Sequence, residues 1–347
     1  MKIKKIAAFM LSGVMMASLL TGCSSVNKDE VVATFDETEV KLGIANFAAR
    51  FEQASYDDFY VAYFGEDVWS SDLYGDGSTM ENSVKDEVIE NLYDMYVLEA
   101  HMSEYGIELT EEEKSAMETA TKDFIAANDK DALEALGADE EIVYQFLELS
   151  TIQNKMYEAI IANADTNVTD EEANTSAYSY VTVSKMVYDE EDGSYVEYTD
   201  EDLAELKATA EEFAAEAQQT SLEEAAEQYA YTVETGTFTA DDENLEEAVL
   251  TALESLEEGE VSAVIDAESD YYVVRLDAKT DEEATENTKQ EIISERQSTL
   301  YQEVLEGWKA DHTWTVNEKV WAKVTFDNLF TTVLESTEEA LIETTEE

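Results

Sequence analysis

Apolar residues change their spacing near residue 178, and this change constrains the fold more than any other feature of the sequence. Before it, they recur at helical intervals, as at Val84 and Val88, which predicts amphipathic helices packed on a shared core. After it, residues 178–198 alternate between apolar and polar around an Asp-Gly turn at 192–193, which predicts β-strands. We therefore expect an α+β fold with a helical first half.

The first half begins with one strand and continues as helices. The strand is Val31–Phe35, and the polar stretch behind it turns the chain into a helix. Thr110 and Glu113 have the spacing of a capping box, in which each side chain bonds the backbone N–H of the other, so a helix should begin there. Further helices are expected over residues 83–105, 130–136 and 139–163.

The second half mixes short strands with helices. Helices are expected over residues 200–218, 221–230 and 244–256, and extended segments over residues 233–238, 259–265 and 269–276. This order, β-α-α-β-α-β-β, indicates a compact α+β domain of about 100 residues. A long helix at 282–310, a strand near Trp314 and an acidic tail at 335–347 complete the chain.

The stretch VTVSKMVY, residues 181–188, predicts a strand with one buried face. Strict alternation places Val181, Val183 and Val187 on that face. Lys185 falls on the same face, between valines, where an ammonium needs a polar partner to offset the loss of water.

The N-terminus predicts export. A basic start is followed by an apolar stretch that is too short for a confident transmembrane helix, and it ends at Leu20-Thr21-Gly22-Cys23. This ending resembles the lipobox of bacterial lipoproteins, which implies a signal peptide at 1–22, cleavage before Cys23, lipid on its sulfur and a tether at 23–30. The protein would then sit lipid-anchored on the extracytoplasmic face of a cell membrane. An ordinary signal peptide with an incidental cysteine is the alternative.

Composition excludes several kinds of partner and chemistry. The chain has 83 acidic and 20 basic residues, a net charge of −63, which argues against nucleic-acid binding because phosphate contacts need lysine and arginine. The single cysteine allows no disulfide within the chain, and with two separated histidines it cannot form a Cys/His metal site. No glycine-rich phosphate loop is present, so no cofactor is expected.

Three stretches together carry a family resemblance. VVATFDETEVKLGIANF (31–47) and VIENLYDMYVLEAHMSEYGIELTEEEK (88–114) resemble the opening of extracytoplasmic foldases of the PrsA and SurA type. Residues 180–277 resemble a parvulin, the peptidyl-prolyl isomerase domain of those proteins, most specifically in LEEAVLTALESLEEGEVSAVIDAESDYYVVRLDAK. The resemblance implies a helical chaperone domain, made by residues 31–175 and 281–330 together, with a parvulin-like α+β domain inserted at 178–278.

The resemblance also implies positions for the parvulin pocket. Parvulins carry a histidine in the first strand and another in the last, and these positions here hold Lys185 and Tyr272. The apolar proline pocket would fall on Leu245 and Val249, with Phe238 in the shortened stretch before them. Because the first and last strands of a parvulin are neighbours, we expect the Lys185 ammonium to bond the phenol oxygen of Tyr272.

The histidine positions shape the functional expectation. His101 and His312 are the two histidines of the chain, and both lie outside 180–277, so a parvulin histidine pair is impossible there. We expect a membrane-anchored chaperone that binds unfolded or nascent secreted proteins and whose parvulin-like domain is catalytically degenerate. A homodimer is one assembly that the sequence allows. The aromatic residues expected to meet clients are Phe47, Phe51, Phe59, Tyr63, Phe64, Trp308, Trp314 and Trp321. The alternatives are an active isomerase with an altered site, or a surface lipoprotein that serves as an adhesin or envelope scaffold.

Overall fold

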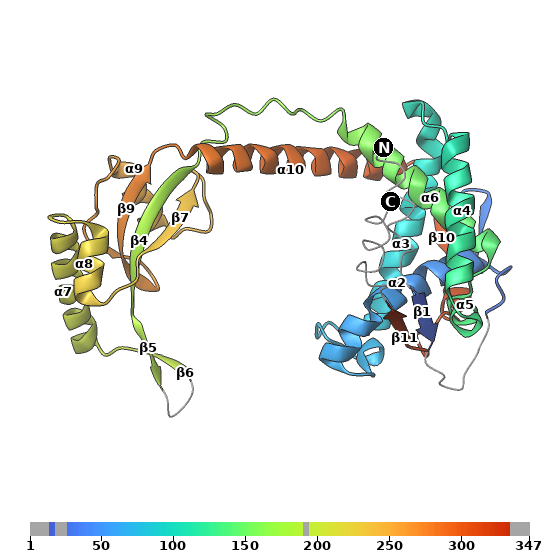
Figure 1. Ribbon diagram of the computed structural model, residues 1–347, viewed down its shortest axis with the longest axis horizontal. Helices are drawn as coiled ribbons and strands as arrows, with labels where there is room; N and C mark the ends of the chain where they lie inside the picture. The colour runs from blue at the N-terminus through green and yellow to red at the C-terminus, as the bar shows by residue number, and fades with distance from the viewer. Residues whose placement is uncertain (1–13, 18–25, 190–193, 334–347) are drawn as a thin grey trace, which may run out of the picture. The chain divides into compact units, whose positions relative to one another are not determined.

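The computed structural model describes residues 14–17, 26–189 and 194–333 (Figure 1). Cys23, the turn at 192–193 and the acidic tail at 335–347 lie outside the described residues. The chain divides into two units, of which unit 1 comprises Met1–Asn163 and Thr299–Glu347 and unit 2 comprises Ala164–Ser298. Both helices and antiparallel sheets are present, so the predicted α+β class is confirmed.

Unit 1 is built mainly from helices. They are α2 (Leu42–Phe64), α3 (Met80–His101), α4 (Glu111–Ala127), α5 (Lys130–Leu136), α6 (Glu140–Ile161) and α11 (Glu318–Trp321), with single turns of 3-10 helix at Val68–Ser70 and Met102–Tyr105. The long helix α10 (Glu282–Lys309) begins in unit 2 and its last turns belong to unit 1. Apolar residues of α2, α3 and α6 meet in one core, which Leu42, Leu92 and Ile152 fill.

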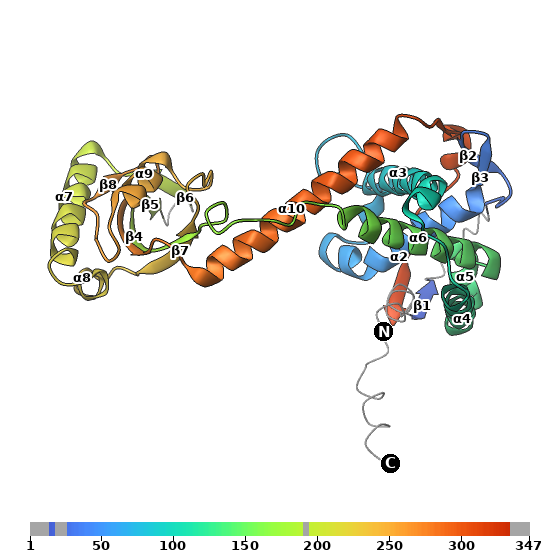
Figure 2. The same ribbon diagram turned by 90° about the horizontal axis from the view of Figure 1, so that it is seen from above.

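Two small sheets complete unit 1 (Figure 2). The first contains β2 (Val31–Phe35), β3 (Thr38–Lys41) and β10 (Trp314–Val316), in the order β10-β2-β3. The second pairs β1 (Val14–Ala17) with β11 (Phe330–Val333). The predicted strands at 31–35 and near Trp314 are confirmed, whereas β3 was missed because it is short and buries only Val40 among its side chains.

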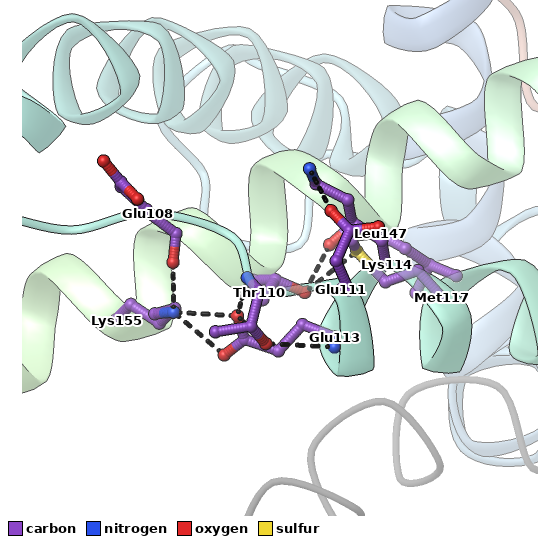
Figure 3. Close-up of polar contacts among 9 residues, drawn as sticks. Glu108, Thr110, Glu111, Glu113, Lys114, Met117, Leu147 and Lys155 are labelled. Atoms are coloured by element: carbon purple, nitrogen blue, oxygen red, sulfur yellow. Dashed lines mark hydrogen bonds and ion pairs between the residues drawn. The ribbon is translucent and has the colours of Figure 1, made fainter.

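The capping box at the start of α4 is confirmed (Figure 3). The Thr110 hydroxyl accepts from the Glu113 N–H at 3.2 Å, and the Glu113 carboxylate accepts from the Thr110 N–H at 2.8 Å. Lys155 of α6 donates to both Glu113 carboxylate oxygens, at 2.9 and 2.8 Å, and to the Glu108 carbonyl at 2.7 Å. The cap therefore also ties α4 to α6.

Unit 2 contains a four-stranded antiparallel sheet in the order β7-β4-β9-β8. The strands are β4 (Ser176–Ser184), β7 (Glu234–Phe238), β8 (Ile265–Asp266) and β9 (Asp270–Ala278), and the helices are α7 (Asp200–Ala217), α8 (Leu222–Tyr229) and α9 (Glu247–Ser255). Successive residues of a strand point to opposite faces, so each central strand packs two cores. Val181, Val183 and Val273 pack with α7 and α8, while Tyr178 and Val274 pack with α9 on the other face.

The predicted strand at 181–188 is wrong in its second half. Strand β4 ends at Ser184, and β5 (Met186–Asp189) then pairs with β6 (Ser194–Glu197) in a separate hairpin. Val181 and Val183 are buried as expected, but Val187 is 39% exposed. The bend at Lys185 breaks the alternation, so this lysine does not lie among valines on one continuous face.

Candidate functional site

Four of the five predicted pocket positions come together on the face of the unit 2 sheet that packs with α9. Phe238 ends β7, Leu245 precedes α9, Val249 lies in α9 and Tyr272 lies in β9. All four belong to one apolar cluster, in which Phe238 and Val249 are buried and Leu245 and Tyr272 are half-buried. We call this the α9 cluster.

Two tyrosines of β4 extend the α9 cluster and were missed by the sequence analysis. The rings of Tyr178 and Tyr180 stack with centroids 5.3 Å apart, and Tyr178 meets Phe238 edge-on at 5.7 Å. Gly236 leaves room for the ring of Tyr178, because a Cβ at that position would lie 2.8 Å from it. The signal that could have found them is their spacing of two residues, around Ser179, which places both rings on one face of a strand.

Lys185 lies outside the α9 cluster. Its ammonium donates to Asp266 Oδ1 at 2.7 Å and to the Ala267 carbonyl, and it lies 4.6 Å from the centroid of the Tyr271 ring. The predicted bond to Tyr272 is wrong, because the residue opposite Tyr272 in the β4–β9 ladder is Thr182. Tyr271 and Tyr272 point to opposite faces of the sheet, so Lys185 and the phenol of Tyr272 are separated.

The carboxylate that holds Lys185 also holds a second lysine. Lys207 of α7 donates to Asp266 Oδ2 at 2.8 Å. Hydrogen bonds from Lys185 and then from Lys207 lower the pKa of Asp266. The Lys185 ammonium thus bonds one carboxylate and one main-chain carbonyl. These bonds join the residue after β4 to β8 and to Ala267, which follows β8.

The phenols of the α9 cluster stay protonated near neutral pH. The Tyr180 hydroxyl donates to Glu234 Oε2 at 2.9 Å, and this bond, together with burial, raises the pKa of Tyr180 to about 12. Burial raises the pKa of Tyr272 as well. The cluster thus combines apolar side chains with tyrosine rings whose hydroxyls are neutral at neutral pH.

The two histidines lie together in unit 1. The Nε2 atoms of His101 and His312 are 3.0 Å apart, although the residues are 211 positions apart in sequence. Glu104 faces Nδ1 of His101 at 2.6 Å, and Asp36 faces Nδ1 of His312 at 2.8 Å. This pair joins the end of α3 to the segment before β10. The sequence analysis did not predict the contact because the two histidines are far apart in the sequence.

Unit 1 carries an exposed aromatic patch at the end of α2. Phe59 and Tyr63 are both exposed and their ring centroids are 4.7 Å apart, with Tyr63 73% exposed. The patch comprises the exposed Tyr56, Phe59, Tyr63 and Phe64, which ring contacts link to one another directly or through Tyr60. Of the residues expected to meet clients, Phe47 and Trp321 are buried in cores instead, because the apolar interior of unit 1 takes them up.

Within the described residues, no cluster of three or more His, Cys, Asp or Glu side chains is placed to hold a metal ion. In the same part of the chain, no helix has the length and apolar character needed to cross a membrane.

Comparison with known proteins identifies the domain that contains the α9 cluster. Residues 184–288 match the family model of the PPIC-type PPIase domain. The predicted resemblance to parvulins is confirmed over these residues. No curated protein matches the chain. We call residues 176–278, from the start of β4 to the end of β9, the parvulin-like domain.

The chain is also similar to solved structures of foldases and chaperones. A foldase protein PrsA from Streptococcus pneumoniae is 21% identical, with 72% of this chain and 96% of that chain covered and a TM-score of 0.28. A PrsA foldase from Lactococcus lactis is 15% identical, with coverage of 85% and 97% and a TM-score of 0.35. A SurA-like chaperone from Campylobacter jejuni is 13% identical, with coverage of 82% and 98% and a TM-score of 0.28.

Proposed function

We propose that this protein is a lipid-anchored extracytoplasmic chaperone of the foldase type, and that its parvulin-like domain binds client segments without isomerising them. The family match over residues 184–288 supports the link to prolyl-peptide recognition. The resemblance of residues 31–47 and 88–114 to the opening of PrsA- and SurA-type foldases supports the chaperone role.

The observation that carries the proposal is where the five predicted pocket positions lie in the structure. The apolar ones gather in the α9 cluster, in which Phe238 and Val249 are buried and Leu245 and Tyr272 stay partly exposed, and we place the client contact at these last two. Of the two histidine positions of the family, one holds Lys185, which is bonded to Asp266 and lies over the ring of Tyr271. The other holds Tyr272, whose side chain packs on the opposite face of the sheet from that of Tyr271. Apolar contacts without the histidine pair of the family favour holding over catalysis.

The aromatic patch of unit 1 supports a second contact with clients. Soluble monomers seldom expose several neighbouring aromatic rings unless they bind something. Unfolded chains expose apolar side chains of every kind, and aromatic rings pack against them without requiring one sequence.

Membrane attachment rests on the sequence Leu20–Cys23. Metabolic labelling with a radioactive fatty acid, followed by mass spectrometry of the mature N-terminus, tests it. Label on the wild-type chain that disappears in Cys23→Ala supports the anchor, whereas an unlabelled chain that begins elsewhere excludes it.

The decisive experiment measures isomerase and holding activity on the same preparations. With a proline-containing tetrapeptide, we expect a rate at background for the wild-type chain. In suppression of aggregation of a reduced, unfolded protein, we expect activity that falls severalfold in the double variant Phe59→Ser, Tyr63→Ser. Tyr157→Ser, which removes an exposed aromatic ring of α6 in unit 1 outside the patch, is the matched control and should retain it. Equal suppression by all three chains would contradict a client-binding role for the patch.

An active isomerase is the second candidate, and the gathering of Phe238, Leu245, Val249 and Tyr272 in one cluster favours it. Prolyl isomerisation requires twisting and desolvation of an amide, which an apolar face can assist. A tetrapeptide rate above background that falls in Tyr272→Phe would establish this alternative in place of ours.

A further inference from the structure

Strand β1 lies antiparallel on strand β11 in unit 1 (Figures 1 and 2). The register pairs Ala17 with Phe330, Met16 with Thr331 and Val14 with Val333. Among the residues that the structure describes, this sheet has two strands, and β1 covers that edge of β11.

The chain leading into β11 is held by a buried polar network on α2. Arg50 donates to the Thr325 carbonyl at 2.7 Å and to the Asn328 carbonyl at 3.0 Å. Gln53 donates to the same Asn328 carbonyl at 2.9 Å. Both side chains are buried, so these bonds are shielded from competition with water.

Asp57 fixes the first residue of β11. Its carboxylate accepts from the Phe330 N–H at 2.6 Å and from Trp69 Nε1 at 2.6 Å, and the Arg50 guanidinium lies 4.9 Å from the centroid of the Phe330 ring. None of these contacts involves β1. The start of β11 is therefore positioned by α2, whether or not β1 is present.

The direction of the Phe330 N–H shows which N–H groups of β11 face β1. Because successive N–H groups of a strand point to opposite sides, and that of Phe330 points to Asp57, the N–H groups of Thr331 and Val333 point to the β1 side. Their partners in the register are Met16 and Val14, so the main chain of these two residues completes the ladder.

β1 belongs to the segment that the proposed function removes, because cleavage before Cys23 takes away residues 1–22. We propose that in the mature protein the exposed edge of β11 binds an extended apolar segment of an unfolded client chain by strand addition, and that Val14–Ala17 fills this place in the precursor. This inference rests on the cleavage in the proposed function. The segment seated there, Val-Met-Met-Ala, is itself extended and apolar.

Strand addition suits a protein with many clients. The main chain supplies the hydrogen bonds, so the edge accepts any sequence that can extend. A precursor whose own signal segment occupies the edge would bind clients poorly until it is cleaved.

The test uses a labelled peptide of residues 11–20 and the chain 24–347, which lacks both the signal segment and the cysteine. We expect the peptide to bind, and the chain 1–347 carrying Cys23→Ser to bind it at least about tenfold more weakly. N-methylation of Met16, whose N–H faces β11, should weaken binding about tenfold. N-methylation of Met15, whose N–H faces away, is the matched control and should change binding little.

Hydrogen exchange gives a second measurement on the protein itself. Bound peptide should slow exchange at the amides of Thr331 and Val333. Absence of peptide binding to the chain 24–347, or equal weakening by the two N-methyl groups, would overturn the inference. The outcome is separable from the proposed function, because aggregation suppression and the position of the natural N-terminus are measured independently of this peptide.

Discussion

At the scale of the residue, Lys185 shows that a family resemblance can name a position without predicting the contacts made there. It stands where parvulins have a histidine, but the chain bends there and its ammonium bonds Asp266 and the Ala267 carbonyl. Two of the three N–H groups of this ammonium therefore have partners, and the contact joins the residue after β4 to β8 and the residue that follows it.

Glu113 is the residue whose ionisation we expect to influence unit 1 most. Its side chain is 5% exposed and meets Lys155. Burial, the largest single influence, raises the pKa of Glu113, but hydrogen bonds from Lys155 and Thr110 outweigh it and lower the pKa below its ordinary value of 4.5. A lowered pKa stabilises the folded state above the ordinary value, and this contribution is lost as pH falls through the folded value.

We therefore predict that Glu113→Gln lowers the free energy of unfolding by about 1.5–3 kcal/mol at neutral pH. The difference from wild type should shrink as pH falls below about 4.5, because the wild-type carboxyl then takes up a proton. Urea unfolding across this range measures it. Glu112→Gln, an exposed neighbour in the same turn, is the control and should change stability by less than about 0.5 kcal/mol. A difference that keeps its size in acid would contradict the assignment.

At the scale of the element, α2 carries a polar stripe on its buried side. Asn46, Arg50, Gln53 and Asp57 follow one another at intervals of three or four residues, and all four are buried. Arg50 donates to the Ala135, Thr325 and Asn328 carbonyls. The stripe therefore binds main-chain groups of neighbouring segments, and it positions β11 as described above.

Removing the guanidinium of Arg50 takes one donor from each of these carbonyls, of which that of Asn328 still accepts from Gln53. We predict that Arg50→Met lowers the free energy of unfolding by about 3–5 kcal/mol, since it breaks a buried charged network. Thermal and urea unfolding measure the change, and faster hydrogen exchange at residues 329–331 would locate it. Lys41→Met removes an exposed ion pair with Glu39 and should cost less than about 1 kcal/mol. If both substitutions lower the free energy of unfolding by the same amount, the buried network of Arg50 stabilises the fold no more than an exposed ion pair does.

At the scale of the whole molecule, charge opposes compactness. A net charge of −63 on 347 residues means that most carboxylates have like-charged neighbours, and self-repulsion of this kind destabilises a folded state. Local pairs such as Lys309 with Glu90 and Asp94 relieve only a small part of it.

We predict that the chain becomes more stable when sodium chloride is raised from about 0.01 M to about 0.15 M, because the screening length falls from about 30 Å to about 8 Å. A gain of about 1 kcal/mol would raise Tm by roughly 2–4 °C. Calorimetry in sodium chloride, with choline chloride at equal ionic strength as the control, measures the effect. Equal gains in both salts indicate screening, whereas a Tm that is unchanged or falls with salt would contradict the prediction.

The sequence by itself determined the elements and the domain type. The α+β class, the strands around residues 31–35 and 270–278, and the capping box at Thr110 were predictable because periodicity and cap spacing are written within a few neighbouring residues. The positions Phe238, Leu245, Val249 and Tyr272 could be named from the order of pieces in a resembling family, and the structure gathers them in one cluster.

Only the tertiary structure decided which partner each polar group takes. Lys185 bonds Asp266, which is 81 positions away, and the sequence could not choose between that carboxylate and the phenol of Tyr272. A polar stripe on a helix also has the same spacing whether it faces water or buried carbonyls, so α2 gave no sign that Arg50 points inward. The pairing of β1 with β11 likewise depends on two segments at opposite ends of the chain. Such choices depend on how distant segments pack, because burial and hydrogen bonding are settled by the whole fold and not by neighbours in sequence.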